Sequence, residues 1–398
     1  MDRTETDILV VGAGAAGAIA TAAFAHAGFD TLCVDPVAPV TDGGAEGADL
    51  RTTALLTPAR DLLERIGVWH RLAPGAVPLR VMRMVDASGP DGAVRVSRDF
   101  DAADLGQEAF GWNVPNWRLR ATLAGHLADL PGATLRYGAG IADILPRLDR
   151  AIVRLTDGTR IDARLVVAAD GRDSPTRAAL GIGARTRRFG QKALSFAVTH
   201  DAPHDGISTE IHRGGGPFTL VPLPDHEGRP CSGIVWMEDG TEAMRLADLD
   251  VARFEATATE RSAGLYGPLT LVTRRQVWPI VTRRADRMTA RRTALIAEAA
   301  HAMPPIGAQG LNTSIADIRV LRDLAAAAPR DIGSRAMLDA YARAREGDVT
   351  MRGAGISALN IVSQSGHPAV QAVRSAGIAA LCDIAPLRRR VMRMGLGE

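Results

Sequence analysis

The stretch Asp7–Pro36, DILVVGAGAAGAIATAAFAHAGFDTLCVDP, decides the fold of this chain. Its apolar run Ile8–Val11 predicts a parallel strand that is buried on both faces. Gly12, Gly14 and Gly17 then form the pattern G-x-G-x-x-G. In that pattern the first glycine permits a tight turn, the second lets a pyrophosphate approach the backbone, and the third lets the next helix pack closely on the strand. The stretch therefore predicts a strand, a phosphate-binding turn and a helix in direct succession.

The residues after the glycines complete a dinucleotide-binding unit. The small residues from 15 to 25 continue as a helix whose free N–H groups face the phosphates, and Gly28 stands where that helix ends. Thr31–Val34 is expected to form a second strand, which Asp35 ends. Asp35 follows the glycines at about the 20-residue spacing of a carboxylate that binds a ribose hydroxyl. We therefore expect a bound dinucleotide; the alternative is a plain strand–helix–strand turn.

A second match to the same pattern lies near the C-terminus. Gly353, Gly355 and Ala358 fit G-x-G-x-x-G/A, but they follow Met351-Arg352 rather than an apolar strand. No strand ending in an acid follows them. This copy predicts a helix face of small residues, not a nucleotide site.

Length, composition and charge limit the class of protein. At 398 residues the chain exceeds the roughly 250–300 at which a single core stops growing, so we expect two domains. A net charge of +2 does not indicate a nucleic-acid binder. Cys33, Cys231 and Cys382 are widely spaced and predict neither disulfides nor a metal site. The charged start and the lack of a long apolar run predict a cytoplasmic protein, or one peripheral to a membrane at its inner face.

Two later strands are followed by residues suited to a ligand. Leu165–Ala169 is expected to be a buried strand, and Asp170 follows it at the edge where ligands bind to parallel sheets. Thr293–Ile296 is expected to be another, followed by a glycine-rich loop and a helix. Because Gly310, Leu311 and Asn312 open that helix, their N–H groups and the helix dipole can stabilise an anionic ring. His301, between the strand and this loop, is expected to be a hydrogen-bonded loop histidine.

The remaining segments suggest a second domain and a basic C-terminal helix. Between residues 185 and 279 short strands alternate with turn residues, which predicts an antiparallel sheet. Arg51, after the second strand, either pairs with a phosphate or is a surface charge. In residues 386–396, Leu387, Val391 and Met394 share one face and arginines occupy much of the rest. This helix either packs on the core or lies on an anionic lipid surface.

Three motifs in this order carry a resemblance: GAGAAG at 12–17, VVAADGRDSPTR at 166–177 and AEAAHAMPPIGAQGLN at 297–312. Together they resemble the single-component FAD-dependent aromatic hydroxylases with the para-hydroxybenzoate hydroxylase fold. DLRTTALLTPARDLLERIGVW, VPNWRLRATL, GGGPFTLVPLP and APLRRRVMRMGLG resemble the ubiquinone-biosynthesis branch of that family. The resemblance covers essentially the whole chain.

The resemblance implies an α/β fold: a Rossmann-like FAD-binding domain, an inserted and mainly antiparallel β-sheet substrate domain, and a C-terminal helical region. The expected FAD-binding domain comprises residues 1–75, 101–184 and 281–340. The expected substrate domain comprises strands in 76–100 and the sheet in 185–280, and the C-terminal helices comprise 341–398.

The resemblance also implies roles for residues at matching positions. Gly12, Gly14 and Gly17 would hold the FAD pyrophosphate, and Asp35 the adenosine ribose. The other cofactor residues implied are Arg51, Asn116, Asp170, Glu298, Gly310, Leu311 and Asn312. Pro304 and Pro305 would border the substrate pocket. No catalytic side chain and no metal is assigned.

Two positions depart from the family pattern. Ala297-Glu298 stands where the family usually has Gly-Asp, and that Asp normally accepts a hydrogen bond from the ribityl chain. Asn116 stands where many relatives carry Arg.

No nucleophile–base pair stands out, so a cofactor must supply the reactivity. The resemblance implies that NAD(P)H and dioxygen are co-substrates and that the aromatic ring of a polyprenyl phenol in ubiquinone biosynthesis is hydroxylated. One alternative is an FAD-dependent reductase of prenyl chains. Another is a non-catalytic flavin-fold subunit of a biosynthetic complex. Peripheral membrane contact is compatible with each of them.

Overall fold

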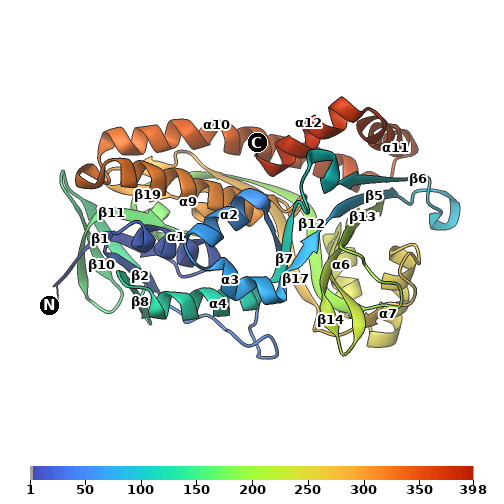
Figure 1. The fold of residues 1–398 in the computed structure, drawn as a ribbon, viewed down its shortest axis with the longest axis horizontal. Coiled ribbons are helices and arrows are strands. Elements are labelled where there is room, and N and C mark those ends of the chain that lie inside the picture. The colour runs from blue at the N-terminus through green and yellow to red at the C-terminus, as the bar shows by residue number, and fades with distance from the viewer. Residues whose placement is uncertain (1–2, 398) are drawn as a thin grey trace.

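The computed structural model describes residues 3–397 and is built around two large sheets (Figure 1). The first has the strand order β18-β19-β11-β1-β2-β8, in which the central strands run parallel. Its strands are β1 (Arg3–Val11), β2 (Thr31–Asp35), β8 (Ala133–Tyr137), β9 (Ile141–Pro146), β10 (Ala151–Leu155), β11 (Arg160–Ala168), β18 (Thr289–Ala290) and β19 (Thr293–Leu295). This is the doubly covered parallel sheet that the buried apolar runs predict.

Helices from distant parts of the chain pack together in the half of the molecule that contains the first sheet. They are α1 (Ala15–His26), α2 (Thr57–Arg65), α3 (Trp69–Leu72), α4 (Asn116–Asp129), α5 (Pro175–Ala179), α8 (Ala297–Ala300) and α9 (Gln309–Ala327). In α1 every residue from Gly17 to Ala25 is buried, because small side chains let the helix lie close to β1 and to α9. The largest apolar cluster of the protein fills this region.

The second sheet forms the other half of the molecule. Its order is β20-β17-β12-β15-β14-β13-β5-β6, with β16 paired to β12, and all its pairs are antiparallel except β5 with β13. Its strands are β5 (Val81–Asp86), β6 (Val96–Asp101), β12 (Ala184–Thr199), β13 (Ile207–Gly214), β14 (Gly216–His226), β15 (Arg229–Asp239), β16 (Thr270–Leu271), β17 (Gln276–Ala285) and β20 (His301–Ala302). The expected boundary at 280 therefore falls inside β17.

Two smaller groups of elements complete this half. Helices α6 (Gly240–Ala247) and α7 (Val251–Arg261) pack against the second sheet. A three-stranded sheet of β3 (Thr52–Leu56), β7 (Gly111–Pro115) and β4 (Val77–Leu79) lies between the two halves.

The C-terminal helices lie along one edge of the molecule (Figure 1). They are α10 (Arg335–Gln364), α11 (Pro368–Asp383) and α12 (Ala385–Leu396). The second glycine pattern lies within α10, so the expectation of a small-residue helix there is confirmed. Within residues 3–397, no single helix has the length and apolarity to cross a membrane, whereas α11 and α12, bent by 98°, meet those criteria as a pair.

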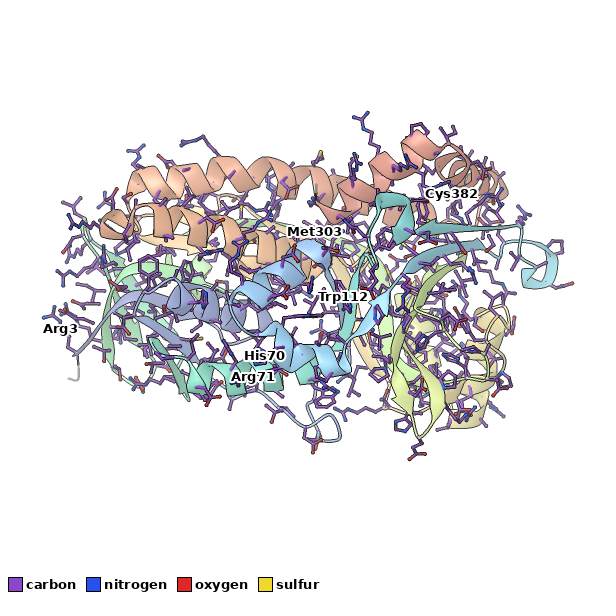
Figure 2. The ribbon with its side chains drawn as sticks, in the orientation of Figure 1. Arg3, His70, Arg71, Trp112, Met303 and Cys382 are labelled. Atoms are coloured by element: carbon purple, nitrogen blue, oxygen red, sulfur yellow. The ribbon has the colours of Figure 1, made fainter. Side chains whose placement is uncertain are left out.

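The apolar face predicted for the C-terminal helix is wrong. Leu387 and Met394 are exposed, and Met392 and Leu396 are the buried residues of α12. They pack with Cys382 of α11, which is labelled in Figure 2, and with the aromatic residues Phe100 and Phe110. The helical period allows either face to be apolar, and the neighbouring elements select the one that packs. The helix thus packs on the core. Arg389, Arg390 and Arg393 remain exposed, whereas Arg388 is half-buried and pairs with Asp104.

Candidate functional site

Pairing in the first sheet brings the predicted motifs to one edge. Val11 lies beside Ala168 and Val34, and Ala168 lies beside Leu295, with all four strands parallel. The segments that follow β1, β2, β11 and β19 therefore leave the sheet side by side. Ligands bind at this carboxyl edge in open parallel sheets. Segments almost 300 residues apart in the chain thus meet at one edge of the sheet.

The three glycines of the first motif have three different structural roles. Gly12 has φ +102°, a left-handed conformation that glycine adopts without strain, and its N–H donates to Val34 O at 2.8 Å. A Cβ at Gly17 would overlap the carbonyl oxygen of Gly12, so this glycine permits the close helix–strand contact. A Cβ at Gly14 would have no protein atom within 4 Å. The space beside Gly14 is therefore an open cradle at the start of α1, as a pyrophosphate requires.

Asp35 and Asp170 both hold the loops that carry them. Asp35 accepts the N–H of Ala13 at 2.6 Å and that of Val37 at 2.9 Å, so it fixes the glycine turn. Asp170 accepts from the Ser174 hydroxyl and from the N–H of Thr176, at the start of α5. Each carboxylate stands at the predicted edge with further lone pairs for a ligand.

Arg51 is held by a buried carboxylate and an aromatic ring. Its Nε and Nη2 donate to Asp49 at 2.8 and 2.7 Å, and its guanidinium lies 4.2 Å from the centre of the Trp278 ring. Burial raises the pKa of Asp49, but hydrogen bonds and charge from Arg51 outweigh it and hold the pKa below its ordinary value. This rigid bidentate pair presents a cation of fixed orientation.

Asn116 and Arg120 complete the cluster around Asp49. Asn116 donates to Asp49 at 3.1 Å and accepts from the Thr53 hydroxyl at 2.7 Å. Arg120, one turn later in α4, lies 3.6 Å from the same carboxylate. Arg120 also borders a small cavity together with Ala13 and Ala15 of the glycine turn. An arginine is thus present near the phosphate cradle although position 116 is Asn.

The departure at Ala297-Glu298 has a backbone consequence. Ala297 has φ +54°, the left-handed region in which an L-residue costs about 1–2 kcal/mol and glycine does not. The Glu298 side chain is half exposed at the site edge, and its carboxylate lies 3.5 Å from Arg172. The buried Nε of Arg172 has no hydrogen-bond partner among the described residues. A polar group therefore fits beside Glu298 and Arg172.

The loop before α9 supplies backbone donors. Gly310 and Leu311 lie in the first turn of this 19-residue helix, where N–H groups have no partner within the helix. The Asn312 side chain joins this turn to β3, because it accepts from Leu56 N at 3.0 Å and donates to Ala54 O at 2.7 Å. Pro304 is buried and Pro305 is exposed just before this turn.

His301 belongs to a buried ionic network beneath the site. Its Nε2 lies 2.6 Å from Oδ2 of Asp317, and Oδ1 of Asp317 accepts from Nε of Arg345 at 2.8 Å. The Asp317 side chain is fully buried. The expected hydrogen bonding of His301 is confirmed, with a charged partner, but the residue lies in the short strand β20 and not in a loop.

Sequence reasoning missed Asp49, Arg120, Arg172, Trp278 and Asp317. The i,i+4 spacing of Asn116 and Arg120 was the one usable signal, because it places both on one face of a helix. The other contacts join residues from separate helices, strands and loops, and the spacing of residues in the sequence does not predict such contacts.

A family model described as an FAD binding domain matches residues 5–350. The chain belongs to this family. This match, together with the relatives described next, confirms the predicted FAD cofactor and the fold class. It also confirms that the chain is an FAD-dependent monooxygenase of the hydroxylase type.

Curated relatives in this FAD-binding family include hydroxylases of ubiquinone biosynthesis. The ubiquinone hydroxylase UbiL of Rhodospirillum rubrum is 32% identical over 98% of this chain and 89% of its own length. The 3-demethoxyubiquinol 3-hydroxylase of Escherichia coli is 25% identical over 100% of both chains.

Solved structures share the fold. The p-nitrophenol 4-monooxygenase PnpA of Pseudomonas putida superposes with a TM-score of 0.80 at 20% identity, covering 100% of this chain and 99% of that one. Aklavinone-11 hydroxylase, solved with FAD and aklavinone, superposes with a TM-score of 0.69 at 23% identity, covering 90% of this chain and 69% of that one.

Proposed function

We propose that this monooxygenase hydroxylates the ring of a polyprenylated phenol in ubiquinone biosynthesis, using NAD(P)H and dioxygen. The observation that carries the proposal is the match along 98% of the chain to a ubiquinone hydroxylase, joined to an intact glycine cradle and helix start. When bound, FAD supplies the redox and oxygen-transfer chemistry. The protein supplies binding, orientation and the exclusion of water.

We assign FAD-holding roles to residues at the shared sheet edge. Gly12, Gly14 and Gly17 accommodate the pyrophosphate, and Asp35 accepts from the ribose. Cations at Arg51 and Arg120 offset the phosphate charge, with Asp49 and Asn116 orienting them. Asp170 shapes the neighbouring loop. The N–H groups of Gly310, Leu311 and Asn312 stabilise negative charge on the ring system, and Pro304 and Pro305 border the substrate.

Turnover of a prenylated phenol tests the assignment. The holoenzyme should consume NAD(P)H and dioxygen in a substrate-dependent manner and yield a product with one added oxygen atom. A saturated prenyl chain formed without oxygen uptake would instead identify a prenyl reductase. Identifying the quinone precursor that accumulates when the gene is deleted would assign the step.

Glu298 tests whether the site has adapted to its departure from the family. We expect the carboxylate to accept a hydrogen bond from the ribityl chain, a charge-assisted bond of about 1.5–3 kcal/mol. Glu298→Ala should therefore weaken FAD binding by roughly ten- to a hundred-fold, whereas Glu298→Asp should be tolerated or bind more tightly. Flavin fluorescence titration gives the three dissociation constants. Equal constants would remove this role from Glu298 and favour a non-catalytic subunit.

A prenylated substrate resides in a membrane, so we also propose peripheral contact with the cytoplasmic face of a bilayer. The basic, exposed side of α12 supports this proposal, since Arg389, Arg390 and Arg393 lie on the surface.

A further inference from the structure

The outward side of α10 is exposed and apolar, and no residue on it belongs to the FAD site. Five residues at helical spacing form this surface, which we term the outer face: Met351, Gly355, Ala358, Leu359 and Val362. Met351 is 61% exposed and Leu359 56%. From Gly353 to Val373 the chain carries no Asp, Glu, Lys or Arg. A contiguous exposed apolar surface of this kind marks a site of contact.

Apolar exposure is concentrated at this edge of the molecule. Of the sixteen large hydrophobic side chains exposed within residues 3–397, eight lie between Met351 and Met394. The other eight are spread over the rest of the chain. Scattered exposure is ordinary for a monomer, so the cluster at α10–α12 needs its own explanation.

Arginines from the substrate sheet flank one side of the outer face. Arg187 of β12 and Arg284 of β17 are exposed, and both line a cavity of about 360 Å³. Its opposite wall includes Ala354, Ala358 and Ile361 of α10. The cationic groups therefore stand directly beside the edge of the apolar surface.

Arginines of α12 flank the opposite side. Residues nine apart on a helix project in opposite directions, so Arg352 points away from the cavity side that Ile361 lines. Arg352 donates to the carbonyl of Met394 at 3.4 Å, which places α12 on that side. The exposed α12 arginines, at 389, 390 and 393, form no ion pair with a carboxylate in residues 3–397.

We infer that the outer face of α10, between these two groups of arginines, is the surface on which the protein rests on an anionic lipid bilayer. An apolar strip enters the acyl boundary while flanking guanidinium groups meet phosphate headgroups. Charge complementarity selects this partner, because the two flanks carry the same sign and the strip between them carries no charge. A protein partner of mixed charge would not require that pattern.

The cavity gives the surface a second use. It extends from Ala358 of the outer face and the neighbouring Ile361 to Ala302 and Met303. Met303, which is labelled in Figure 2, directly precedes Pro304. The Met303 methyl group lies 4.0 Å from a Cβ placed at Gly353, so Met303 stands next to α10 in this cavity. A lipid-borne substrate can therefore pass from the bilayer to the site edge; this part rests on the proposed function.

Vesicle flotation of the holoenzyme tests the surface. The test variant carries Met351→Gln, Leu359→Gln and Val362→Gln. The matched control carries Met244→Gln, Val251→Gln and Leu265→Gln, which replace side chains of similar exposure on the substrate half. The parent and control should float with phosphatidylglycerol-containing vesicles at low salt, and the test variant should bind at least roughly tenfold more weakly.

Charge is tested on the same vesicles. Replacing Arg389, Arg390 and Arg393 by Gln should weaken binding roughly a hundred-fold, and high salt or pure phosphatidylcholine should have a similar effect. Equal flotation of the test and control variants would overturn the inference. So would a parent dimer that the outer-face substitutions dissociate, with no vesicle binding, because a second copy would then be the occupant. Turnover of a water-soluble short-chain phenol, measured separately, reports on the proposed function and not on the surface.

Discussion

A Gly14→Val variant is expected to fold normally and to lose bound FAD. The backbone at Gly14 has φ −62° and ψ 174°, which valine adopts readily, and a Cβ there meets no protein atom within 4 Å. The added side chain fills only the space that the pyrophosphate needs. Purified variant protein should therefore lack the visible flavin spectrum while retaining the parent's circular dichroism.

Gly17→Val separates the ligand effect from a folding effect. A Cβ at Gly17 overlaps the Gly12 carbonyl, so this variant should lose the helix–strand contact itself. We expect insoluble protein or a lowered melting temperature even without FAD. Unchanged flavin content in the Gly14→Val protein would contradict the assignment of the cradle.

Asp317→Asn is expected to destabilise the protein by about 3 kcal/mol, because it removes the fully buried charge shared by His301 and Arg345 and leaves Arg345 paired only with the more exposed Asp348. The Asp317 side chain is fully buried between His301 and Arg345. Burial raises the pKa of Asp317, but the charges and hydrogen bonds of His301 and Arg345 lower it by more, so the net shift of this pKa is downward. This contribution to stability is present at neutral pH and is lost as the pH falls through the lowered pKa.

Urea unfolding of the parent and the variant measures the difference. Asp323→Asn is the matched control, since Asp323 lies on the same helix and its carboxylate, which pairs with Arg322, is 54% exposed. That substitution should change the free energy of unfolding by less than about 1 kcal/mol. A similar small change at Asp317 would show that the network is not a source of stability.

The sequence by itself predicts the nucleotide-binding unit, because local steric requirements determine which residues it can contain. Gly12, Gly14 and Gly17 are needed because a turn, a ligand and a helix each approach the backbone within a few residues of one another. Asp35 follows these glycines after one helix and one strand, and the lengths of those two elements set the spacing. The sequence also predicts that the segments at Asp170 and Gly310 lie near this unit, because residues that follow parallel strands meet at one sheet edge.

Tertiary packing decided the rest of the site. Asp49 orients Arg51 and Arg120 through contacts between separate elements, and no periodicity in the sequence records such contacts. The C-terminal helix has two possible apolar faces, and the buried residues that it meets, among them Phe100, Phe110 and Cys382, select the face of Met392 and Leu396. Neighbouring elements likewise decide which face of α10 is exposed. Its small and apolar residues fit a buried helix equally well, and they are exposed because no other element of the described chain covers them.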